Sequence, residues 1–138
     1  MKSIYPSILI FLLAALSPLL ATPEFEVTSP QNRQLAANKY LHGQSHQIAV
    51  HTKGLVCTSC AIGLRIHLKK LAGIDKSQFN KGTLLDASTQ LIVVAYKPDA
   101  QPDLESVRKA IHNAGYEAAH YYQWDGARVR LHSFEGAE

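Results

Sequence analysis

Cys57 and Cys60 are the two cysteines of this 138-residue chain, and they lie three positions apart in the stretch VCTSC. Two thiols at this spacing can close a disulfide, act as a thiol–disulfide redox couple, or hold a metal ion. A disulfide across so short a loop removes little entropy from the unfolded chain, so it would stabilise the fold only weakly. The sequence therefore favours chemistry at these sulfurs over a purely structural bridge.

The local pattern predicts that both thiols sit where a strand turns into a helix. Residues 46–53 alternate apolar and polar side chains, as in a half-buried strand, and Gly54 ends the alternation. Apolar side chains then recur at three- and four-residue steps from Cys60 to Leu71, as on one face of a helix. Cys57 is thus expected in the loop and Cys60 in the first turn of the helix, where unpaired backbone N–H groups favour thiolates.

Two thiolates without a third ligand in the loop suit a soft, two-coordinate ion. Cu(I) prefers sulfur ligands, whereas a zinc site takes about four ligands, or three from the protein when it is catalytic. Val56 precedes the first cysteine and supplies no oxygen ligand. The redox couple remains the alternative, although no tryptophan precedes Cys57 and no proline is well placed to face the thiols.

The N-terminus is typical of a secretory signal. Residues 1–21 carry one early charge, Lys2, then an apolar run and small residues up to Ala21, where we expect cleavage. An uncleaved membrane anchor is the alternative, because residues 4–21 approach the length of a bilayer span. We therefore expect a periplasmic or secreted protein that is free of the membrane after cleavage. Residues 22–45 are polar, with two prolines and a glycine, and are expected to form mainly a linker, with room for a helical turn or two around residues 34–41.

Composition and motifs exclude several functions. The chain carries 14 Lys and Arg against 11 Asp and Glu, a net charge of +3, which is too mild to suggest nucleic-acid binding. It has no phosphate-binding glycine loop, no nucleophile elbow and no paired-histidine zinc motif. We expect that the protein is not an enzyme.

The remaining pattern predicts an α+β fold over residues 46–123. A strand hairpin is expected at 83–87 and 90–96, a helix at 103–114 and a strand at 116–124. With the first strand and helix, this order is that of a ferredoxin-like βαββαβ sandwich, which has a four-stranded antiparallel sheet with two helices on one face. The other face is expected to be open to solvent or to a partner.

The C-terminal residues 124–138 leave two possibilities. Asp125 and Gly126 separate two runs that could each be strands, which is a strong hairpin signal. The segment 127–133 is therefore either an added edge strand or part of a frayed tail.

The stretch GLVCTSC, which contains Gly54, Cys57 and Cys60, resembles the motif of heavy-metal-associated domains, Gly-Met-any-Cys-any-any-Cys. Leu55 stands where that motif has methionine. The resemblance extends over about residues 46–122. Further landmarks follow in the order of the family, namely LAGID, YKPDA and AIHNAGYEA.

This resemblance implies a function and a set of residues. Cys57 and Cys60 would hold one soft ion, Cu(I) or Hg(II), and Tyr116 would lie beside them and control access to the metal. Leu55 would keep the buried apolar anchor of the loop. Family members of this layout are exported mercury-binding proteins, copper chaperones and domains of copper-transporting ATPases. We expect a monomer that passes its ion to a metal transporter or another metal-binding protein in a transient complex.

A third class is a regulatory or scaffold domain in which metal acts as a signal and the open sheet face binds a protein. The basic residues Arg65, Lys69 and Lys70 could form a docking face for an acidic partner, or simply a solvated helix surface.

Overall fold

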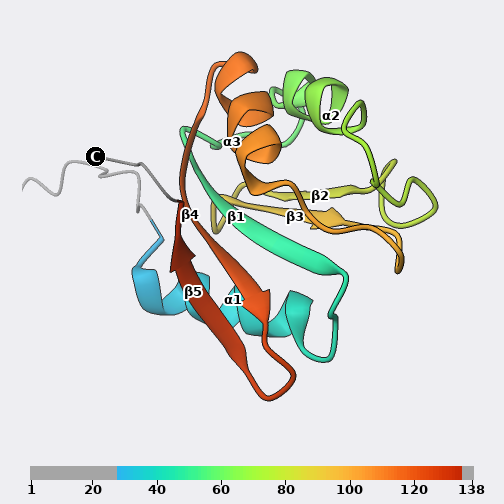
Figure 1. Ribbon diagram of the computed structural model, residues 1–138. Coiled ribbons are helices and arrows are strands. Elements are labelled where there is room, and N and C mark those ends of the chain that lie inside the picture. The colour runs from blue at the N-terminus through green and yellow to red at the C-terminus, as the bar shows by residue number, and fades with distance from the viewer. Residues whose placement is uncertain (1–27, 135–138) are drawn as a thin grey trace, which may run out of the picture.

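The computed structural model describes residues 28–134, in which a five-stranded antiparallel sheet lies between two layers of helix (Figure 1). In chain order the elements are α1 (Pro30–Leu41), β1 (Gln47–Lys53), α2 (Ile62–Leu68), β2 (Thr83–Asp86), β3 (Leu91–Ala95), α3 (Leu104–Asn113), β4 (Glu117–Trp124) and β5 (Val129–Ser133).

The strand order is β2-β3-β1-β4-β5, with β1 at the centre. Val50 of β1 lies opposite Ile92 of β3 on one side and opposite Tyr121 of β4 on the other. The elements from β1 to β4 follow one another as strand, helix, strand, strand, helix, strand. The predicted ferredoxin-like arrangement is therefore confirmed, with one strand added at the edge.

One face of the sheet packs against α2 and α3, as expected (Figure 1). Alternate strand residues such as Ile48 and Val50 point into this layer, because side chains alternate between the two faces of a strand. They meet Leu64 and Leu68 of α2 and Ile111 of α3.

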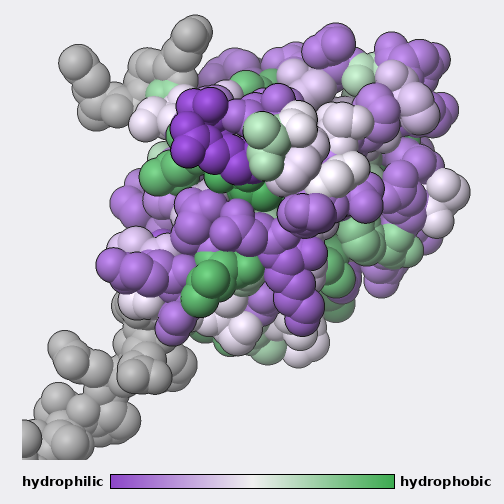
Figure 2. Space-filling model, turned by 90° about the horizontal axis from the view of Figure 1, so that it is seen from below, coloured by the Kyte–Doolittle hydropathy of each residue, from purple (hydrophilic) through white to green (hydrophobic). Residues whose placement is uncertain are grey.

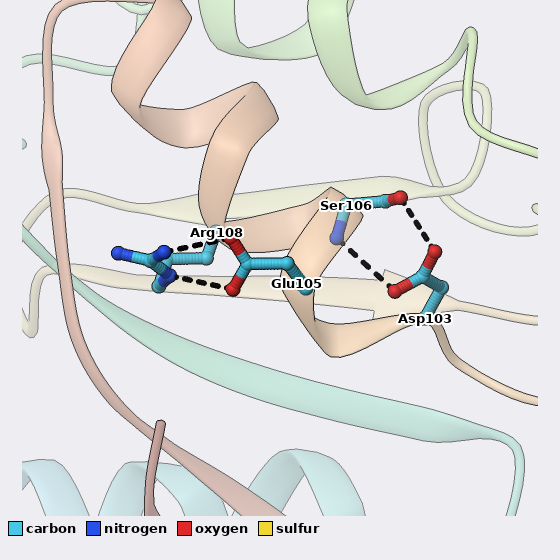
Figure 3. Close-up of polar contacts among 4 residues, drawn as sticks. All are labelled: Asp103, Glu105, Ser106 and Arg108. Carbon is cyan, nitrogen blue, oxygen red and sulfur yellow. Dashed lines mark hydrogen bonds and ion pairs between the residues drawn. The ribbon is translucent and has the colours of Figure 1, made fainter. Parts of the chain in front are cut away.

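The start of α3 is fixed by local polar contacts (Figure 3). The Asp103 carboxylate accepts hydrogen bonds from the Ser106 backbone N–H at 3.2 Å and from the Ser106 hydroxyl at 2.6 Å. One turn along, Arg108 pairs with Glu105 at 2.7 Å. An acidic N-cap of this kind satisfies backbone donors that the helix itself leaves free, so α3 begins at a defined residue.

The second face of the sheet is not open, which corrects the sequence-based prediction. Residues 30–41, expected within a linker, form α1, and this helix covers the face opposite α2 and α3 (Figure 1). Its Ala37 and Leu41 pack against Ala49 and Tyr122 of the sheet. The protein therefore has two apolar layers, one on each side of the sheet.

The sequence pattern that would predict α1 as a covering helix is weak, because one of the three buried positions of this helix is charged. Arg33, Ala37 and Leu41 are buried at four-residue steps, but Arg33 breaks the apolar stripe that would identify a covering helix. Ser29 caps the helix by accepting from the Asn32 backbone N–H at 3.2 Å, and a proline follows the cap. From the α1 side, the surface is largely hydrophilic with small, separate hydrophobic patches (Figure 2).

Residues 129–133 form the edge strand β5, so the hairpin is the correct one of the two alternatives for the tail. Tyr122 of β4 lies opposite Leu131 of β5. The Asp125 carboxylate holds the turn by accepting from the backbone N–H groups of Ala127 and Arg128 at 2.9 and 2.8 Å.

Helix α2 is shorter than expected. It begins at Ile62, so Cys60 lies in the turn before the helix and not in its first turn. The connection from α2 to β2 passes the other end of the sheet, where the Asp75 backbone N–H donates to the Ala95 carbonyl at 2.9 Å. That connection therefore does not approach the cysteines.

Residues 1–27 and 135–138 lie outside the described part of the chain, and with them the predicted signal segment and the start of the predicted linker. Within residues 28–134, no helix has the length and apolar character needed to cross a bilayer.

Candidate metal centre

The loop that carries the cysteines is anchored to the core at its start. Gly54 follows β1 with a φ of 89°, a backbone conformation that glycine adopts without strain. The next residue, Leu55, is fully buried in the layer under α2 and α3. Burial of this side chain fixes one end of the loop, while Cys57 is half-buried and Cys60 is exposed.

Both cysteines are free thiols, and short contacts connect them. The Cys60 backbone N–H donates to the Cys57 sulfur at 3.3 Å. The Ser59 hydroxyl oxygen lies 3.1 Å from the same sulfur. The loop therefore directs two hydrogen-bond donors at Cys57.

These contacts make the two thiols unequal. The Cys60 thiol, the Ser59 hydroxyl and the Cys60 backbone N–H stabilise the Cys57 thiolate and lower its pKa to about 7. The pKa of Cys60 is raised, chiefly because its thiol holds its proton toward Cys57. At pH 7 the Cys57 thiol is therefore about half ionised, and the negative charge of the pair is located on Cys57.

This inequality predicts the pH dependence of thiol alkylation. Thiolates react and thiols do not, so alkylation of Cys57 should reach half its maximal rate near pH 7, whereas Cys60 should react only at higher pH. Mass spectrometry of the reduced protein after brief iodoacetamide treatment at several pH values measures both sites. In Ser59→Ala the Cys57 profile should move to higher pH, because one donor to the thiolate is lost. Identical profiles for the two cysteines would contradict the described contacts.

Tyr116 lies at the base of the cysteine loop. A Cβ at Gly54 would be 3.5 Å from Cδ1 of the Tyr116 ring, so the ring rests against the residue that opens the loop. The ring is half-buried and packs on the core under α2 and α3. The structure therefore brings Gly54, Leu55 and Tyr116 together at the foot of the loop that carries Cys57 and Cys60.

The donor set fits a soft ion with two ligands. Among residues 28–134, no three His, Cys, Asp or Glu side chains gather closely enough to form a metal site. Two sulfurs on an exposed loop match the preference of Cu(I) and similar thiophilic ions, and they are too few for a structural zinc site.

Sequence reasoning missed the role of Ser59, because a serine between two cysteines carries no signal of its own. Among residues 28–134, no histidine joins the two cysteines in a cluster of three possible ligands. His42, for example, contacts Trp124 in a tilted ring pair with centroids 4.9 Å apart, at the C-terminal end of α1.

No protein-family model matches the sequence, and no curated protein matches it significantly. Among solved structures, the chain is similar to a CopZ metallochaperone at 18% identity and a TM-score of 0.43, over 53% of this chain and 98% of that one. It is similar to a copper-binding domain of HMA7, a P-type ATPase, at 22% identity and a TM-score of 0.41, over 52% and 88% of the two chains. The yeast copper transporter domain Ccc2a is similar at 17% identity and a TM-score of 0.41, over 62% and 99%. The fold of this chain is assigned from its own strand order and register.

Proposed function

We propose that this protein binds one soft metal ion, Cu(I) or Hg(II), between Cys57 and Cys60 and passes it to a partner by thiolate exchange. The observation that carries the proposal is the pair of free, accessible thiols in which Cys57 is stabilised as a thiolate. A thiolate is the form of cysteine that binds metal. The motif around the pair, with its resemblance to heavy-metal-associated domains, agrees with this chemistry.

Exchange requires an ion that a partner can reach. In the proposed step a partner thiolate forms a third bond to the ion, one bond to a cysteine of this chain then breaks, and the released cysteine takes up a proton. Cys60 is exposed and has a raised pKa, so it readily takes back its proton and leaves first.

The surroundings of the loop suit a transient protein partner. Val56 and Ile62, on either side of the cysteines, are 63% and 58% exposed. Apolar side chains exposed together often mark a contact surface. We propose a metal transporter or another metal-binding protein as this partner, and export to the periplasm or outside the cell through the N-terminal segment. No enzymatic activity is proposed.

Native mass spectrometry of the reduced protein, titrated with Cu(I), Hg(II) and Zn(II), tests the proposal. We expect one Cu(I) or Hg(II) per chain and weak or no binding of Zn(II), because two sulfurs leave a zinc ion without enough ligands. Preference for Zn(II), or several ions bound with similar affinity, would contradict a two-coordinate soft-metal site.

A thiol–disulfide redox protein is the second candidate, and the unequal pKa values of the two thiols favour it. A low-pKa thiol beside one that keeps its proton is also how a nucleophilic cysteine and its resolving partner are arranged. If this candidate is correct, the oxidised protein catalyses disulfide exchange in a model substrate, and blocking with Cu(I) or Hg(II) only inhibits it.

Replacing Tyr116 by alanine should speed metal transfer without reducing the number of ions bound. The ring rests against Gly54 at the foot of the loop, so its removal loosens the loop and opens one side to an incoming thiol. Groups just outside a metal site commonly change its properties about 10- to 100-fold, and we expect a change in transfer rate near the lower end. Stopped-flow transfer of Cu(I) to a chromophoric thiol ligand measures the rate. An unchanged rate of Cu(I) transfer would show that Tyr116 does not control access to the metal site.

A further inference from the structure

A pair of histidines lies under α1, on the sheet face away from α2 and α3. His51 of β1 is directly opposite His120 of β4 in the register, and their ring centroids are 4.7 Å apart. His51 is 7% exposed, and the Nε2 atom of His120 lies 3.3 Å from the hydroxyl of Tyr122, which belongs to the core under α1. The two imidazoles are therefore part of the layer that α1 covers.

Arg33 holds the N-terminal half of α1 against this layer. Arg33 is 3% exposed, and its guanidinium donates from Nε to the Thr89 carbonyl and from Nη2 to the Thr28 carbonyl, both at 3.0 Å. Its positive charge acts on His51, His120 and Tyr122. One buried cation therefore already sits beside the two histidines.

Among residues 28–134, no acidic side chain acts on the histidine pair to compensate further positive charge. The charged groups that act on the imidazoles are Arg33 from α1 and Lys53 from β1, and Lys53 is itself paired with Glu117 at 2.8 Å. Their other polar neighbours, Gln90 and Tyr122, are uncharged at neutral pH.

Protonation of His51 would also create an unpaired buried donor. Its Nε2 faces the Gln90 side-chain oxygen at 3.4 Å, while its Nδ1 is buried without a hydrogen-bond partner in the described chain. Both nitrogens of a protonated imidazole are donors, so the added proton on Nδ1 would find no acceptor.

We propose that α1 covers the second face of the sheet at neutral pH and is released from it by acid. Protonation of His51 and His120 adds positive charge beside the buried Arg33, and the repulsion frees α1 from this face. Release lets water reach the imidazoles and separates them from the guanidinium. It also exposes apolar side chains of the face, among them Ala49, Leu91 and Val93. The device does not involve Cys57 or Cys60, so it operates whether or not the metal site binds as proposed.

The pH window follows from the two pKa values. Burial, followed by the charge of Arg33, lowers the pKa of His51 from 6.5 to about 4, and the same causes lower the pKa of His120. A histidine with a lowered pKa stabilises the docked state fully above pH 6.5, and this contribution falls as the pH drops toward 4. Each pKa unit corresponds to a factor of ten in an equilibrium constant. The lowered pKa of His51 alone therefore reduces the equilibrium constant for docking of α1 by up to about 300-fold at low pH.

Hydrogen exchange of the reduced protein, corrected for intrinsic rates and compared at pH 7 and pH 4.5, tests the proposal. Protection of backbone amides in residues 30–41 should fall by roughly 60-fold from the His51 contribution alone, while α3 stays protected. Constant protection of α1 over this range, or equal loss in α3, would overturn it.

Variants separate the histidine pair from general acid effects. His51→Gln combined with His120→Gln keeps polar side chains but removes the titration, so α1 protection should become nearly independent of pH. His112→Gln, at an exposed position of α3, is the matched control and should behave as the unmodified protein. Equal acid sensitivity in the double variant would refute the proposal. If that variant does not fold, NMR titration of the unmodified protein decides: loss of α1 protection must follow the titration of His51 and His120.

Discussion

We expect that replacing Cys57 and Cys60 together by serine abolishes the proposed binding of one Cu(I) or Hg(II) ion, while the fold is retained. Serine offers a neutral oxygen in place of a thiolate, and soft ions bind such oxygens poorly. No alternative cluster of three ligands exists among residues 28–134. Either single substitution should lower the affinity by more than about 100-fold, since even groups outside the coordination shell contribute 10- to 100-fold. Competition with a chromophoric Cu(I) chelator measures this loss.

The same variants should change stability little, because neither cysteine belongs to the buried core. Substitutions at such positions usually alter the free energy of unfolding by less than about 0.5 kcal/mol. His112→Gln serves as the binding control and should keep full stoichiometry. If the double serine variant still bound one ion per chain, the metal ligands would have to lie outside this loop.

Leu41→Ala should destabilise the protein by about 2–5 kcal/mol, as expected for truncating a fully buried leucine. Leu41 closes the apolar layer between α1 and the sheet, in contact with a core that includes Val93 and Tyr122. A linker residue would show no such effect. Urea denaturation followed by far-ultraviolet circular dichroism measures the change.

Leu35→Ala in the same helix is the matched control. This side chain is 65% exposed, so its truncation removes little buried surface and should shift the free energy of unfolding by less than about 0.5 kcal/mol. Equal effects of the two substitutions, or no effect of either, would show that α1 does not contribute a layer to the fold.

The parts of this protein that could be predicted from sequence are those whose signals are local. The alternation that predicted β1 and the helical spacing of α3 each lie within a few residues, although β1 is buried on both faces and not on one as expected. The Asp-Gly turn before β5 is also local, but it left the edge strand and a frayed tail as alternatives. The order of the elements was enough to predict the ferredoxin-like sheet, because few topologies accommodate it. Leu55 was expected to anchor the cysteine loop, and it is buried in the core.

The start of α2 was predicted too early, for a local reason. The apolar spacing from Cys60 onward favours a helix, but the contacts of Ser59 and Cys60 with the Cys57 sulfur keep residues 58–61 in a turn. Periodicity identifies a helix more reliably than its first residue.

What the sequence by itself determined is the chemistry available, namely two sulfurs at one bend between a strand and a helix, and the order of the strands and helices from β1 to β4. The tertiary structure alone decided that α1 covers the second face and that His51 meets His120 beneath it. The reason is distance along the chain. Arg33 is accommodated only because the Thr89 carbonyl, 56 residues away, accepts its hydrogen bond, and no local pattern records such a partner. In a sequence, a charged residue on a helix face predicts exposure to solvent. It can be buried only where the fold supplies a hydrogen-bond acceptor for it.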